Sequence, residues 1–121
     1  MNRLILGFLL MLGCSFIPFS EYSETGRASF YANKFHGRKT SSGEIFRHNE
    51  LTAAHKTLPF GTYVTVVNLA NDSIVMVKIN DRLPKSSPSL IDLSIKAAKQ
   101  LNFVSKGHTK VRVEKVSGAL N

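Results

Sequence analysis

The chain is poor in cysteine: its 121 residues include a single one, Cys14, and no tryptophan. One cysteine excludes an intramolecular disulfide and any zinc site built from several cysteines. The patterns G-x-x-x-x-G-K-[ST] and G-x-G-x-x-G are absent, which argues against the nucleotide-binding folds that cradle phosphates. The pattern G-x-S-x-G is absent too, so nothing supports a Ser-His-Asp hydrolase.

Negative charge is also scarce. Sixteen Lys and Arg residues face eight Asp and Glu residues, which gives a formal net charge of +8 at pH 7. The basic residues are spread along the chain, and the export signal described next argues against nucleic acid as a partner. An exported basic domain is better suited to an anionic cell wall or to lipid head groups.

Hydrophobic runs are short, and the longest lies at the N-terminus. Residues 4–12 (LILGFLLML) follow a single early charge, Arg3, and precede Gly13 and Cys14. A short positive end, a short apolar core and a small residue at the junction predict a secretory signal. Residues 10–14 (LMLGC) resemble a bacterial lipobox, which implies cleavage before Cys14 and a diacylglycerol on its thiol.

We therefore expect a signal peptide at 1–13 and a chain that is exported, anchored to the cell membrane through lipidated Cys14, and facing the periplasm or cell wall. Ser15 directly after the cysteine, rather than Asp, favours the outer membrane in a host that has one. Two alternatives remain at this point. Cys14 could be an ordinary residue of a cleaved signal, or residues 4–20 could stay in the membrane as a short anchor.

The remainder divides into a tether, one domain and a tail. Residues 14–26 have no basic residue and no regular period, which predicts a tether that keeps the domain near the membrane. The domain covers 27–117 and the tail 118–121, too few residues for another module, and we expect a monomer.

Within the domain the patterns predict strands and one short helix. Residues 27–32 (RASFYA) and 110–116 (KVRVEKV) alternate as strands do, and residues 61–69 and 73–80 read as a hairpin. Residues 35–48 are polar and should form a long exposed loop. A helix is expected over 95–102, capped by Asp92 or Ser94. Five or so strands with one helix predict a small closed barrel.

Few carboxylates are candidates for acid–base chemistry. Elimination leaves Glu44, in a glycine-containing loop, and Asp81, at the end of an apolar strand, because Asp92 is expected to cap the helix. A structural alternative stands beside each of them. Asp81 could pair with Arg82 or cap a turn, and Glu44 could be a solvated loop charge.

Histidines and aromatic residues carry weaker signals. The spacing of the four histidines matches no zinc signature, so we expect no metal and no other cofactor. His55 is the one of interest, because an apolar run precedes it and a turn follows; it could orient a carboxylate or a sugar hydroxyl. Five aromatic residues could stack on sugar rings, although most should belong to the core: Phe30, Tyr31, Phe35, Phe46 and Tyr63.

Five blocks of the chain form a distinctive series: GRASFY at 26–31, FHGRKTSSGE at 35–44, LTAAHKTLPFGT at 51–62, VKINDR at 77–82 and IDLS at 91–94. In their order and spacing these blocks resemble the rare lipoprotein A family. The resemblance covers nearly all of residues 26–116.

This resemblance implies a six-stranded double-psi β-barrel, an all-β fold with one short helix. It also implies an endolytic lytic transglycosylase that cleaves the MurNAc-β-1,4-GlcNAc bonds of peptidoglycan, prefers strands without stem peptides and leaves 1,6-anhydro ends. The family's catalytic positions fall on Glu44, His55 and Asp81. Phe35, Arg38 and Arg82 lie in the matching motifs and are the expected substrate-binding residues.

The chain departs from the family pattern at two places. Leu83 stands where relatives usually have Gly after the Asp-Arg pair, and a bulky residue there could reshape the cleft. Many relatives also carry a C-terminal domain that binds denuded glycan, which is not seen in these 121 residues, so we expect weaker affinity for long strands. The rival hypothesis is a non-catalytic, expansin-like module that binds and loosens the wall without cutting it.

Overall fold

A computed structural model describes residues 22–116 of the chain. The predicted signal peptide, the lipidation site Cys14 and the tail 118–121 lie outside the described residues. No helix among residues 22–116 is long and apolar enough to cross a membrane.

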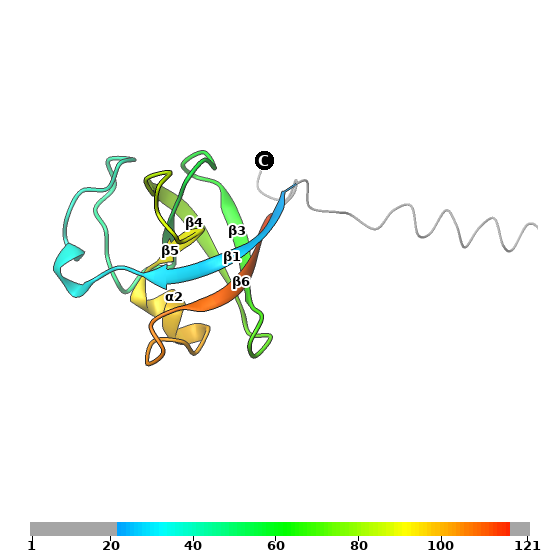
Figure 1. Cartoon of the computed structure of the whole chain (residues 1–121). Coiled ribbons are helices and arrows are strands. Elements are labelled where there is room, and N and C mark those ends of the chain that lie inside the picture. Colours follow the sequence, from blue (N-terminus) through cyan, green and yellow to red (C-terminus); the bar gives the residue numbers. More distant parts are fainter. Residues whose placement is uncertain (1–21, 117–121) are drawn as a thin grey trace, which may run out of the picture.

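Six strands close into a barrel (Figure 1). Around the barrel they follow the order β1-β5-β2-β4-β3-β6. The pairs β1–β5 and β2–β4 are parallel and the other four are antiparallel. The expected six-stranded barrel with one short helix is therefore confirmed. The bounds are β1 (Ser23–Phe30), β2 (Thr52–His55), β3 (Tyr63–Asn68), β4 (Ile74–Arg82), β5 (Ile91–Leu93) and β6 (Thr109–Lys115).

The core fills the barrel with side chains that alternate along the strands. On β4, Val75, Val77 and Ile79 are buried, whereas Ile74 and Met76, which alternate with them, are exposed. Removing this apolar surface from water is the main favourable contribution to folding. The predicted hairpin is present as β3 and β4, which is where β-branched residues are most concentrated.

The helix α2 (Ile95–Gln100) packs against the barrel wall through Ala97 and Ala98. Its N-cap is Ser94, whose hydroxyl accepts from the backbone N–H of Ala97. The expectation that Asp92 caps the helix was wrong, because Asp92 lies inside strand β5. The helix ends two residues earlier than expected, and Asn102 beyond it has a left-handed backbone with a φ of 58°.

The first strand corrects the expected boundary of the tether. Strand β1 begins at Ser23 rather than at residue 27, and residues 23–26 pair with β6. These residues are mostly exposed and polar, so no apolar pattern marks them as a strand. Residues 14–21 of the predicted tether lie outside the described residues.

The long segment between β1 and β2 projects to one side of the barrel (Figure 1). It contains the 3-10 helix η1 (Asn33–Phe35) and a single bridge between Lys39 and Ile45. It is largely exposed, as expected, except that Thr40 and Phe46 are buried. Phe46 stacks on Tyr31 with ring centroids 4.1 Å apart. This stacked pair attaches the segment to the outside of the sheet.

One irregularity changes the direction of the side chains at the end of β4. Ala53 pairs with Ile79, but Ala54 pairs with Asp81, so Asn80 is an extra residue. Strict alternation would point Asp81 inward with Val77 and Ile79. The bulge restores Asp81 to the outer face, on the same side as Lys78.

We predict that Asn68→Ala lowers the free energy of unfolding by about 2–3 kcal/mol. Asn68 is buried; its amide donates to the Leu101 carbonyl at 2.7 Å and its Oδ1 accepts from the Thr109 hydroxyl at 2.8 Å. The substitution leaves buried polar groups without partners. Urea unfolding measures the loss, and the matched change at exposed Asn49 should have little effect. Equal effects at both positions would contradict the prediction.

Candidate active site

Four outward-facing residues line up across neighbouring strands. Ser29 of β1 pairs with Asp92 of β5, Asp92 pairs with Ala54 of β2, and Ala54 pairs with Asp81 of β4. We call these four residues the outer row. Ala28, Ala53 and Leu93, which adjoin three of these residues in the sequence, are buried in the core, and so is Ile79, which the bulge separates from Asp81 by one residue. The row therefore lies on the outside of the sheet.

Asp81 is held by three donors. The Tyr31 hydroxyl donates to Oδ2 at 2.5 Å, and the backbone N–H groups of Ser41 and Arg82 donate to Oδ1 at 2.9 Å each. Partial burial raises the pKa of Asp81, but these donors outweigh it and hold the pKa below its ordinary value. Asp81 is therefore a carboxylate at neutral pH.

An apolar cluster supports this carboxylate. Tyr31, Phe46 and Ala54 are buried together, and Phe35 and Leu83 pack against them. Burial raises the pKa of the Tyr31 hydroxyl, so it keeps its proton and remains a donor to Asp81. Leu83 thus adds apolar contact next to the site.

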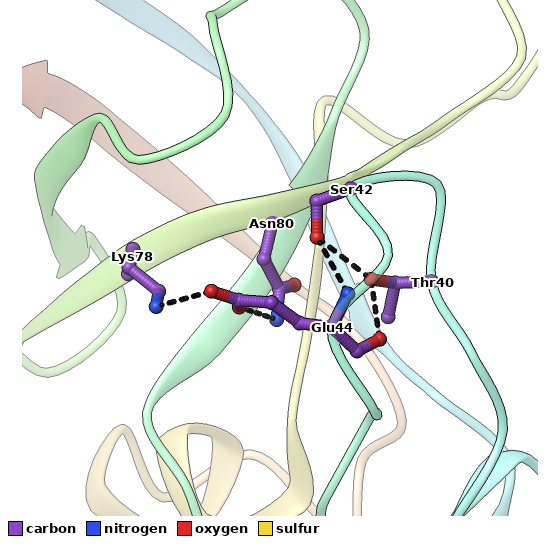
Figure 2. Close-up of polar contacts among 5 residues, drawn as sticks. All are labelled: Thr40, Ser42, Glu44, Lys78 and Asn80. Atoms are coloured by element: carbon purple, nitrogen blue, oxygen red, sulfur yellow. Dashed lines mark hydrogen bonds and ion pairs between the residues drawn. The ribbon is translucent and has the colours of Figure 1, made fainter.

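Glu44 lies over the outer face of β4 and connects it to the projecting segment, as Figure 2 shows. Its two oxygens accept from Lys78 Nζ at 2.9 Å and Asn80 Nδ2 at 3.1 Å. These bonds lower its pKa, and the carboxylate in turn raises the pKa of Lys78. Within residues 22–116, the buried Oδ1 of Asn80 has no hydrogen-bond partner.

Glu44 and Asp81 are linked through one short loop. The Ser41 N–H reaches Asp81, the Ser42 N–H donates to the Asn80 carbonyl, and Glu44 reaches the Asn80 amide. The structure thus brings two of the three predicted catalytic residues to one outer face, although no direct contact joins their carboxylates among the described interactions.

Arg82 does not form the ion pair that the sequence left open. Its guanidinium donates to the carbonyls of His55 at 3.0 Å and Leu58 at 2.7 Å. It also lies 4.5 Å from the ring centroid of exposed Phe60, an aromatic residue that sequence reasoning did not single out. The turn-capping alternative is present in part, because Asp81 accepts from the Arg82 backbone N–H.

His55 faces the other way. It pairs with buried Ile91 and is itself 1% exposed, so its ring points to the inner side of β2, opposite to Asp81. Its Nδ1 accepts from the backbone N–H groups of Thr57 at 3.1 Å and Leu58 at 3.0 Å.

The proton of the neutral His55 ring therefore sits on Nε2, which donates to the Tyr22 hydroxyl at 2.9 Å. The Tyr22 hydroxyl in turn bonds Glu24. Burial lowers the pKa of His55, so the ring is neutral at pH 7. The ring adjoins a pocket of about 220 Å³, which Glu24, Arg27 and Leu90 also line.

Asp92 is the site residue that sequence reasoning missed. Its Oδ1 accepts from the Ser29 hydroxyl at 3.2 Å, and Ser29 also bonds Ser89. Burial, with a smaller contribution from the Asp81 charge, raises the pKa of Asp92 to about 6 against the pull of the Ser29 hydrogen bond. A raised carboxyl pKa is a recognised sign of a functional group. A three-residue strand gives no sequence signal for it.

Two of the predicted substrate-binding residues, Phe35 and Arg38, lie near Tyr31. Phe35 is partly buried and meets the edge of Tyr31, with Arg38 stacked over its ring at 5.7 Å. His36 and His48 stack on each other, with ring centroids 5.7 Å apart. No group of three metal-binding side chains gathers anywhere in residues 22–116.

The fold and the polar outer face define a class of protein, and comparison with known proteins identifies that class. The barrel is a double-psi β-barrel: it resembles an expansin from Clavibacter michiganensis with a TM-score of 0.66 at 17% identity, over 83% of this chain and 53% of that one. It also resembles the Streptomyces papain inhibitor, with a TM-score of 0.64 at 21% identity, over 80% and 96% of the two chains. At such identities the likeness concerns the fold alone.

The family model described as "Lytic transglycolase" matches residues 23–113, and the chain belongs to that family. Among curated relatives, the "Endolytic peptidoglycan transglycosylase RlpA" of Neisseria meningitidis serogroup A is 47% identical over 97 residues, covering 80% of this chain and 41% of the relative. That of Pasteurella multocida is 52% identical over 95 residues, covering 78% and 32%. The chain thus spans well under half the length of these relatives, and the expected rare lipoprotein A family is confirmed.

We predict that the ionisation of Asp92 lowers the free energy of unfolding as pH rises. Its pKa is about 6 in the folded state and 3.8 in an unfolded chain, so the fold binds this proton more tightly. The contribution is complete below pH 3.8 and is lost as pH rises through 6, up to about 3 kcal/mol. Urea unfolding between pH 4 and pH 7 should show this decline as a difference between the wild type and Asp92→Asn, and parallel curves would contradict it.

Proposed function

We propose that the chain is an endolytic lytic transglycosylase that cleaves MurNAc-β-1,4-GlcNAc bonds of peptidoglycan and leaves 1,6-anhydro-MurNAc ends. The observation that carries the proposal is the outer face of the sheet, where a fixed carboxylate, Asp81, lies beside the exposed Glu44 within a domain of the lytic transglycolase family. We further propose a preference for naked glycan strands, which have no stem peptides to clash with the projecting segment.

The reaction requires two proton transfers and no attacking water. A proton goes to the glycosidic oxygen as the bond to C1 breaks, and the C6 hydroxyl of MurNAc closes on C1 while losing its own proton. Asp81 is suited to the second transfer, because its three donors keep it a carboxylate that can stabilise positive charge at C1 and then accept the C6 proton.

Glu44 is suited to shaping the site. Its bonds to Lys78 and Asn80 hold the loop whose Ser41 N–H reaches Asp81, so its loss loosens a donor to the catalytic carboxylate. Phe35, Arg38 and Arg82, at the rim of this face, are proposed to contact the glycan. Partly exposed aromatic and arginine side chains offer stacking surfaces and hydrogen-bond donors of the kind that sugars use.

The place of action is proposed from the N-terminus. Export behind a signal peptide at residues 1–13 and lipidation at Cys14 would hold the domain next to the wall. The excess of basic residues fits an anionic wall polymer.

Incubating the full chain with glycan strands, with and without prior amidase stripping, tests the activity. Mass spectrometry should find new anhydromuramyl ends, mainly on stripped strands, and Asp81→Asn should slow their formation at least about 100-fold. Glu44→Gln should also slow it, whereas Glu114→Gln on the far strand β6 should not. Reducing ends would indicate a hydrolase. Binding to stripped strands without cleavage would indicate the expansin-like module instead.

We predict that His55 acts through the backbone that it holds. His55→Ala removes the acceptor for the Thr57 and Leu58 N–H groups and unsettles the turn whose carbonyls hold Arg82. Activity and melting temperature should therefore fall together, whereas Asp81→Asn should lower activity much further than the accompanying loss of hydrogen bonds lowers the melting temperature. Full loss of activity in His55→Ala at an unchanged melting temperature would instead place the ring in the chemistry.

A further inference from the structure

The proposed reaction lacks a proton donor among the residues that the sequence points to. Asp81 receives three hydrogen bonds and Glu44 receives one from a lysine and one from an amide, and both pKa values lie below the ordinary value. A carboxyl group whose pKa is lowered holds its proton only in acid, so the proton that the glycosidic oxygen needs is better supplied by a carboxyl group whose pKa is raised.

We propose that Asp92 is a second catalytic carboxyl group of this face, which donates the proton to the glycosidic oxygen while Asp81 accepts the proton of the C6 hydroxyl. The proposal rests on the proposed transglycosylase function and adds the residue that supplies its acid.

The position of Asp92 follows from strand register. Asp92 and Asp81 are both partners of Ala54, one on each side, so their backbones are two strand spacings apart, about 10 Å. The side chain between them on the same row is a methyl group. Both side chains extend from the same face of the sheet, so a sugar chain that crosses the outer row would meet the two carboxyl groups in succession.

The surroundings of the two carboxyl groups differ in the way that two roles require. Asp81 has three donors, whereas the described side-chain hydrogen bond to Asp92 comes from one hydroxyl, Ser29. Two titratable groups on neighbouring parts of the chain interact with the charge of Asp92: Asp81 of β4, and Tyr31, which follows β1.

No cation stands among these neighbours. Strand β2 contributes Ala54, and the buried side chains of α2 are two alanines. Burial and the like charge of Asp81 both favour the protonated form of Asp92, which is the form that a general acid needs.

The step balances without another reactant. The Asp92 proton moves to the glycosidic oxygen, the C1–O bond breaks with its electron pair on that oxygen, and the C6 oxygen bonds to C1. The C6 proton moves to Asp81. Solvent then returns a proton to Asp92 and removes one from Asp81, so the enzyme is restored and the substrate is split into two chains.

Kinetics of Asp92→Asn with stripped glycan strands test the role. The rate should fall about 100-fold to 10,000-fold. The wild-type rate should decrease as pH rises above about 6, where Asp92 loses its proton, and the residual rate of the variant should lack this decrease. Asp72→Asn, the same change in the exposed turn between β3 and β4, is the matched control and should behave as the wild type.

A measurement without substrate accompanies the kinetics. Carbon NMR of the side-chain carboxyls of the full chain should show Asp92 titrating near pH 6, and its midpoint should fall in Asp81→Asn because a like charge has gone. A midpoint that does not move would show that the two groups are not coupled and would overturn the proposal.

The outcomes separate the two proposals. If the wild type makes no anhydro ends, the proposed function fails and this role fails with it. If the wild type makes them and Asp92→Asn keeps the wild-type rate, only the role of Asp92 fails. A slower variant that retains the wild-type pH profile would mean that Asp92 merely supports the structure, and this result also overturns the proposal.

Discussion

One extra residue in β4 determines which carboxyl groups lie on the outer face of this barrel. Without the register shift at Asn80, Asp81 would continue the inward series of Val77 and Ile79, and a carboxylate would be buried in an apolar core at large cost. With it, Asp81 lies on the outer face, level with Ala54 and Asp92. The closed barrel makes that row rigid, because each of its strands is hydrogen-bonded on both sides. The candidate site is thus built on strands and completed by one projecting segment.

The pKa of each carboxyl group on this face depends on the groups that surround it. The stacked pair of Tyr31 and Phe46 brings the projecting segment onto the sheet, and with it the hydroxyl and the N–H groups that stabilise a negative Asp81. Asp92, two strands away, has a hydroxyl and the repulsion of that same charge. The pKa values of two similar carboxyl groups are thereby shifted in opposite directions. Such a separation of pKa values is the usual means by which one site runs acid and base chemistry.

Part of the fold and part of the candidate site could be predicted from the sequence. The β3–β4 hairpin was visible because its β-branched residues alternate over long strands, and Asp81 stood out because it ends such a strand. Strand β5 has three residues and no period of its own, so the sequence pattern around Asp92 is that of a helix cap. The start of β1 was missed because exposed polar residues give no apolar pattern.

His55 shows a further limit of sequence reasoning. It follows Ala54 directly, and neighbouring residues on a strand face opposite sides, yet a motif conveys only that both are near the site. The face on which each side chain lies depends on pairing with strands that are distant in the sequence. No local sequence pattern specifies the register of that pairing.

The most direct test of the central claim is a crystal structure of Asp81→Asn with a naked glycan fragment long enough to span the site. The account predicts that the sugar chain crosses the outer row, with the scissile oxygen between positions 81 and 92 and the C6 hydroxyl of MurNAc turned toward position 81. A fragment bound instead in the pocket beside His55, with the outer row uncovered, would contradict it.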